Sequence, residues 1–93
     1  MPRKLTDWDL RTIADVTSEM AKLRGAAFDA HAQALAFARA AQVDADFRAR
    51  LAEVARRIEA RRAMTMARRL LVPIAPLFRD LEREAEVILG REG

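Results

Sequence analysis

The chain has 93 residues, which is enough for one domain and too few for two. Hydrophobic residues make up 52% and charged residues 33%, and this balance predicts a folded chain rather than a disordered one. The net charge of +3 is only mildly basic, and the absence of cysteine excludes disulfides, thiolate metal sites and a cysteine nucleophile.

The N-terminus leads into an acidic, amphipathic stretch and contains no apolar signal core, so we expect a cytoplasmic chain. The longest apolar run covers residues 70–78 and is interrupted by Pro73 and Pro76. Its nine residues fall far short of the roughly 20 that span a bilayer. We therefore expect no membrane-spanning segment.

A first long helix is predicted over residues 7–41. Thr6 is placed as its N-cap, with Asp9 three residues later in a variant of the capping box. Gly25 falls inside this range, but residues 26–28 offer no new cap, so the helix is expected to continue. The prediction depends on apolar residues that recur every three or four positions: Ile13, Val16, Met20, Leu23, Ala27, Ala30, Ala34, Phe37 and Ala41.

A second long helix is predicted over residues 45–89, after a turn in which Asp44 caps the new helix. Pro73 and Pro76 disfavour helical geometry just before them. Because the apolar stripe keeps its phase across both prolines, we expect a kink at residues 72–76 and no reversal of the chain. The stripe comprises Ala60, Met64, Ala67, Leu71, Ile74, Phe78, Leu81, Ala85 and Ile88.

These two helices predict a single all-α domain over residues 1–93, built as a long antiparallel hairpin with a proline-kinked second helix. Helix 7–41 alone would extend roughly 50 Å, about twice the diameter of a compact domain of this length. A hairpin of that shape cannot cover its own apolar faces, so we expect two copies to form a dimeric helical bundle. The alternative is a three-helix bundle in which the prolines form a real turn.

Arginines form the most distinctive polar pattern. On one continuous helix, offsets of 7, 11 and 18 positions would place four of them on one face, and a fifth would widen this basic stripe. Guanidinium groups suit phosphates or a carboxylate-rich partner. We take as candidate binding residues Arg50, Arg57, Arg61, Arg68 and Arg69.

The alternative interpretation is that the stripe is a solvated face with local ion pairs. Arg61, Arg68 and Arg69 lack acidic neighbours, so we expect these three to seek an external or cross-helix partner. Acidic residues do precede the other two arginines by four positions, in the pairs Asp46–Arg50 and Glu53–Arg57.

No pattern in the chain predicts a catalytic residue, a metal site or a cofactor. The only histidine, His31, lacks metal-ligand spacing, and Trp8, Met64 and Met66 are expected to be packing groups. An acidic run near the C-terminus is expected to be surface charge; it comprises Asp80, Glu82, Glu84 and Glu86.

The sequence favours a non-enzymatic protein–protein interaction module, a small accessory subunit that self-associates or docks on a larger protein. A first alternative is a nucleic-acid-binding protein that uses the basic helix face. A second is a small all-helical enzyme that holds an anionic metabolite through arginines, which requires a pocket on which they converge.

Overall fold

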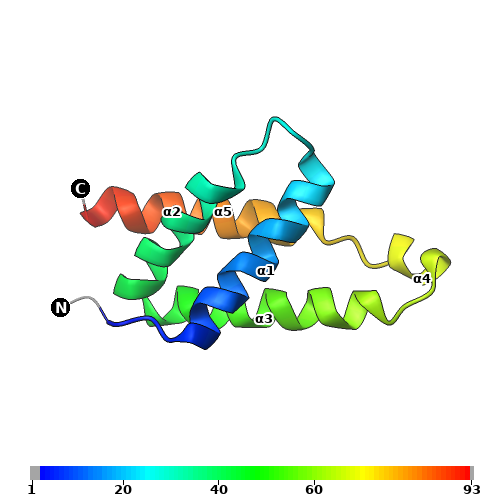
Figure 1. The fold of residues 1–93 in the computed structure, drawn as a ribbon, viewed down its shortest axis with the longest axis horizontal. Coiled ribbons are helices and arrows are strands. Elements are labelled where there is room, and N and C mark those ends of the chain that lie inside the picture. The colour runs from blue at the N-terminus through cyan, green and yellow to red at the C-terminus, as the bar shows by residue number, and fades with distance from the viewer. Residues whose placement is uncertain (1–2, 93) are drawn as a thin grey trace.

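The computed structural model describes residues 3–92, and every regular element within them is a helix (Figure 1). The prediction of an all-α chain is therefore confirmed. The described residues extend 45 × 26 × 19 Å. In chain order the helices are α1 Asp7–Arg24, α2 Ala30–Val43, α3 Ala45–Arg62, α4 Met66–Leu70 and α5 Ala75–Glu92.

The helix predicted over residues 7–41 is divided into α1 and α2, so that prediction is wrong. Gly25 ends α1 with φ 80° and ψ −165°, a conformation that only glycine adopts without strain. The chain then turns, and Asp29 begins α2 by accepting a 3.0 Å hydrogen bond from the amide of Ala32. Asp29 is the cap that the sequence analysis overlooked.

The turn predicted at residue 44 is confirmed. The Asp44 carboxylate accepts a 2.8 Å hydrogen bond from the amide of Phe47 and starts α3. At the other end of the first helix, the capping box predicted for Thr6 and Asp9 is also present. Short polar side chains therefore begin α1 and α3 as predicted.

The single kinked helix predicted over residues 45–89 is not observed. Figure 1 shows α3 and α5 running in opposite directions, with α4 at the end of the molecule where the chain turns back. Pro73 lies between α4 and α5, and Pro76 occupies the first turn of α5, where a backbone N–H has no helical partner to lose. The reversal begins earlier, at Ala63, where α3 has already ended.

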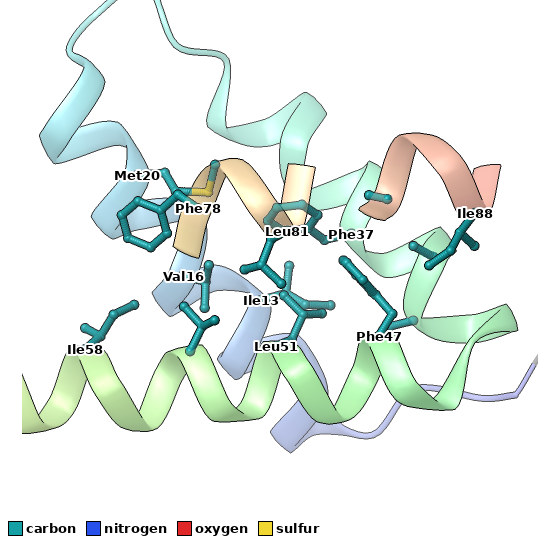
Figure 2. Close-up of a cluster of buried hydrophobic side chains, with 14 of the residues drawn as sticks. Ile13, Val16, Met20, Phe37, Phe47, Leu51, Ile58, Phe78, Leu81 and Ile88 are labelled. Atoms are coloured by element: carbon teal, nitrogen blue, oxygen red, sulfur yellow. The ribbon is translucent and has the colours of Figure 1, made fainter. Parts of the chain in front are cut away.

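Four helices share one apolar core, in which α1 and α2 cover the apolar faces of α3 and α5 (Figure 2). Near its centre the rings of Phe37 and Phe47 pack with centroids 5.7 Å apart. Its largest fully buried side chains are Phe37, Phe47, Phe78, Met20, Leu51, Leu81 and Val16. The premise that two long helices leave their main apolar faces uncovered is therefore wrong, because the breaks fold those faces onto one another.

Two glycines provide a matched test of the α1–α2 turn. Gly25→Ala should lower the free energy of unfolding by about 1–3 kcal/mol, because alanine is strained at this positive φ even though no atom lies within 4 Å of its Cβ. Gly90→Ala, in helical geometry and equally unobstructed, should raise stability by up to about 1 kcal/mol. Urea denaturation measures both, and equal effects of the two variants would contradict the assigned turn.

Candidate functional site

The first part of the predicted arginine stripe is engaged in ion pairs within the chain. Nε of Arg50 lies 2.7 Å from a carboxylate oxygen of Glu84 on α5, and Nε of Arg57 lies 3.4 Å from Glu53. The expected Glu53–Arg57 pair is confirmed, whereas the Asp46–Arg50 pair is replaced by a contact between helices. Both arginines therefore have carboxylate partners within the chain.

Arg61 and Arg69 hold the chain reversal together by exchanging hydrogen bonds with backbone carbonyls. Arg61 donates to the carbonyl oxygens of Val72, at 2.8 Å, and of Arg69, at 3.1 Å. Arg69 donates in return to the carbonyl oxygens of Arg61, at 2.8 Å, and of Arg62, at 2.9 Å. Arg69 thus donates to two carbonyls in the last turn of α3, and the carbonyl of Arg61 also accepts a 3.0 Å hydrogen bond from the amide of Met64.

We call residues 63–73 the α4 arm. Thr65 caps α4 through the amide of Arg68, and the amides of Leu71 and Val72 continue the turn by donating to carbonyls within α4. Together with the exchange between Arg61 and Arg69, these bonds give the arm a defined backbone. The arginine stripe is broken here, because the α3 helix ends before Arg68 and that residue belongs to α4.

The apolar side chains of the α4 arm lie in solvent. Met66, Leu70 and Leu71 are 75%, 83% and 82% exposed, and the α4 helix contributes no side chain to the core. The expectation that Met66 is a packing group is therefore wrong. Trp8, at 54% exposure, is likewise outside the core, but it lies at the opposite end of α1 from the α1–α2 turn. The arm is the place where highly exposed apolar residues adjoin one another in the chain.

The arm also carries positive charge, and none of its arginines forms an ion pair among residues 3–92. Arg68 and Arg69 lie within the arm and Arg61 just before it, and residues 60–79 contain no acidic residue. Arg61 and Arg69 donate to neutral carbonyls, which leaves their charges uncompensated, and Arg68 is exposed without an ion pair among residues 3–92. The arm therefore displays apolar side chains and net positive charge together.

Arg62, next to the arm, behaves differently because three carboxylates surround it. Its guanidinium lies 2.8 Å from Asp15, 2.9 Å from Glu19 and 3.2 Å from Glu59. Hydrogen bonds from Arg62 lower the pKa of Glu19 below its ordinary value, against the opposing effect of burial. This cluster joins α1 to the end of α3. It is the last group of ion pairs along α3 before the basic arm begins.

A second polar contact fixes the N-terminus of α1 against α3. The Asp9 side chain is 2% exposed and accepts hydrogen bonds from Nε of Arg48, at 2.7 Å, and from the amide and hydroxyl of Thr6, at 2.8 and 2.9 Å. Burial by itself would raise the pKa of Asp9, but the bonds from Arg48 and Thr6 outweigh it and the pKa is lowered. Asp9 is a structural anchor.

The surface hollows do not assemble a recognisable catalytic site. An open groove of about 920 Å³ lies between α1 and α3, with small side chains such as Ala14, Ser18 and Ala55 along it and Trp8 among its lining residues. A smaller hollow of about 270 Å³ lies between α3 and α5. Each contains three arginines, as the enzyme alternative requires, but carboxylates line both as well: Arg11, Arg56 and Arg62 with Asp15 and Glu59 in the larger, and Arg50, Arg83 and Arg91 with Asp44, Asp46 and Glu84 in the smaller. A third hollow, of about 70 Å³, is lined by Arg61, Arg62 and Arg69 together with Glu19.

Among residues 3–92, no three histidine, cysteine or acidic side chains come together as a metal site. No helix within that range is long and apolar enough to cross a membrane. Comparison of the chain with protein-family models, curated proteins and solved structures finds no match. The α4 arm, defined by its own geometry, is therefore the candidate functional site.

The lowered pKa of Asp9 predicts a specific loss of stability in acid. Its contribution is present above the unfolded pKa, near 3.8, and is lost as the pH falls through the lower folded value. Asp9→Asn should be less stable than wild type by about 2 kcal/mol at pH 7, and the two unfolding free energies should converge towards pH 2. The exposed Asp7→Asn serves as a control and should change stability by less than about 0.5 kcal/mol. A constant difference between pH 7 and pH 2 would refute the assignment.

The exchange between Arg61 and Arg69 predicts that the arm loosens when one arginine is removed. In Arg61→Ala, the amides of Leu71 and Val72 should exchange with deuterium about tenfold faster, while exchange of the core amides is unchanged. Arg57→Ala, which removes an arginine from the same helix, should leave both arm amides as protected as in wild type. Identical arm protection in the two variants would show that the arginine exchange does not hold the arm.

Proposed function

We propose that the chain is a non-enzymatic interaction module, a small accessory chain that docks on a larger partner through the α4 arm. One observation carries the proposal: three adjoining apolar side chains are at least 75% exposed on a segment whose backbone is held by specific hydrogen bonds. No other large apolar side chain among residues 3–92 is more than 57% exposed.

The arrangement fits a binding element because its order is established before binding. Hydrogen bonds from Arg61 and Arg69 already restrict the backbone, so less conformational entropy is lost when a partner covers the tip. An unoccupied apolar tip adds nothing to the stability of the free chain, since burial of apolar area is what stabilises. The geometry is therefore better explained by a contact made outside the chain than by packing within it.

The charge of the arm favours a different partner over a second copy. Two arms meeting tip to tip would bring Arg61, Arg68 and Arg69 of each copy together with no carboxylate from residues 60–79 between them. The predicted dimer also depended on uncovered helix faces, and the core within one chain covers the main apolar faces of its four long helices. These two points support a larger, negatively charged partner as the proposed target.

The nucleic-acid alternative loses support for a related reason. It relied on a continuous arginine face, but Arg50 and Arg57 are engaged with carboxylates and Arg68 lies on another helix. The enzyme alternative relied on converging arginines, and each of the three hollows that gathers arginines also contains at least one carboxylate. The interaction module is the proposal that uses the exposed apolar side chains of the α4 arm, which are not part of the core.

The arm can be tested without knowing the partner. We expect wild-type protein in an extract of its host, with membranes retained, to migrate in particles far larger than its own 10.5 kDa. Leu70→Ser/Leu71→Ser should migrate as free protein, because the exposed leucines that drive docking are gone. The matched control Leu23→Ser/Leu35→Ser removes two half-exposed leucines outside the arm and should migrate like wild type.

Chemical denaturation completes this experiment, since both double variants should unfold within about 0.5 kcal/mol per substitution of wild type. Wild-type protein that migrates only as a free monomer, or an arm variant that migrates with wild type, would overturn the proposal. Light scattering on the purified chain separates self-association: a monomer is expected, and a dimer lost only in the arm variant would assign the arm to a second copy instead.

A further inference from the structure

We infer that the surface on which the α4 arm docks is an anionic lipid bilayer. Met66, Leu70 and Leu71 enter the boundary between headgroups and acyl chains, and Arg61, Arg68 and Arg69 remain at the level of the lipid phosphates. The inference rests on the proposed function, because it names the partner of the same arm. It is carried by the shape, the size and the charge of the arm taken together.

The shape of the arm suits a deformable surface better than a rigid one. α4 lies at one end of the long axis of the molecule, beyond the body formed by the other helices (Figure 1). Leu70 and Leu71 are consecutive and both more than 80% exposed, so apolar side chains point away from the arm in more than one direction. Such a convex tip requires a matching cavity in a rigid partner, whereas lipid rearranges around it.

The size of α4 points the same way. Met66, Leu70 and Leu71 are the highly exposed apolar side chains of the arm. α4 has five residues, too few to present the repeated ridge that a helix lays into a protein groove. A small apolar tip is sufficient for a bilayer when electrostatic attraction adds to it.

The charge of the arm supplies that attraction. No acidic residue occurs from 60 to 79, and the backbone carbonyls bound by Arg61 and Arg69 leave both guanidinium groups positively charged. Arginine pairs well with phosphate oxygens, and basic residues beside an inserted apolar group strengthen binding to anionic leaflets. The acidic residues nearest in the chain lie behind the tip, where Glu59 is paired with Arg62.

Co-sedimentation with vesicles tests the inference directly. We expect the chain to bind vesicles of equimolar phosphatidylglycerol and phosphatidylcholine, and to bind pure phosphatidylcholine at least about tenfold more weakly. Raising the salt concentration should weaken binding to the mixed vesicles. Leu70→Ser/Leu71→Ser should lower the partition coefficient at least about tenfold, and Leu23→Ser/Leu35→Ser should leave it unchanged.

Two charge-reversal variants distinguish binding through a direct contact of the arm with the vesicles from binding through the net charge of the whole chain. Arg68→Glu and Arg39→Glu change the net charge equally, but Arg39 is an exposed residue of α2, outside the arm. Arg68→Glu should weaken binding to the mixed vesicles several-fold more than Arg39→Glu does. Equal effects would show that net charge alone attracts the chain, and that result would overturn the inference.

Insertion can be detected by fluorescence. In a Trp8→Phe background, Leu71→Trp places the only indole on the arm, and its emission should shift to shorter wavelength with the mixed vesicles and be quenched by brominated acyl chains. The same substitution at position 35, Leu35→Trp, should show neither effect. Binding without a shift at position 71 would place the arm outside the bilayer and overturn the inference.

The outcomes distinguish this inference from the proposed function. If the chain fails to bind mixed vesicles while its arm still determines migration in host extracts, the lipid inference is wrong and docking through the arm stands, with an acidic protein as the partner. If arm substitutions change neither vesicle binding nor migration, both are wrong. If the arm governs both and the large particles disappear when detergent dissolves the membranes, the two are supported together.

Discussion

The structure depends on burial of one apolar core between two helix pairs. α1 and α2 fold back on one another at Gly25, and α3 and α5 do so through the α4 arm, so that the apolar side chains of four helices face a common centre. Without the turn at Gly25, Phe37 on α2 could not reach Phe47 on α3 as it does. Burial of this area, at about 25 cal/mol per Å², is the main term that opposes chain entropy.

Polar contacts then orient the helices that the core brings together. Asp9 and Arg48 connect the start of α1 to α3, and Arg62 connects its far half to the end of α3 through Asp15 and Glu19. The Asp9 contact is the more consequential, because its carboxylate is almost fully buried and depends on its partners. The exposed pairs around Arg62 are worth less individually, but together they neutralise the surface next to the arm.

The arm differs from the rest of the chain in the exposure of its apolar side chains and in the partners of its arginines. Met66, Leu70 and Leu71 in the arm are 75–83% exposed, whereas no large apolar side chain elsewhere among residues 3–92 exceeds 57%. Arg61 and Arg69 donate to backbone carbonyls, whereas Arg48, Arg50 and Arg62 contact carboxylates on other helices. This combination keeps a small segment ordered without covering its apolar surface and without cancelling its charge. The proposed docking function and the anionic bilayer as its target both follow from that one contrast.

Spacing in the sequence was enough to predict the helical class, the Asp44 turn, the Thr6–Asp9 capping box and most of the buried stripe residues of α1 and α5. The exception in α1 is Leu23, which is 54% exposed. These features depend on neighbours within one helical turn, where spacing is sufficient information. It also identified Arg61, Arg68 and Arg69 as arginines without local acidic partners. It could not show that two of them would bind backbone carbonyls seven or more positions away.

Only the tertiary structure decided where the helices break and which part of a stripe stays in water. The stripe through Met64, Ala67 and Leu71 has the same period as the buried stripe through Phe78 and Leu81, yet only the latter faces α1 and α2. The spacing of apolar residues in the sequence shows which of them share one face of a helix. Those residues are buried only if another helix packs against that face. The positions of those opposing helices depend on the reversals at Gly25 and Ala63, which involve the whole chain.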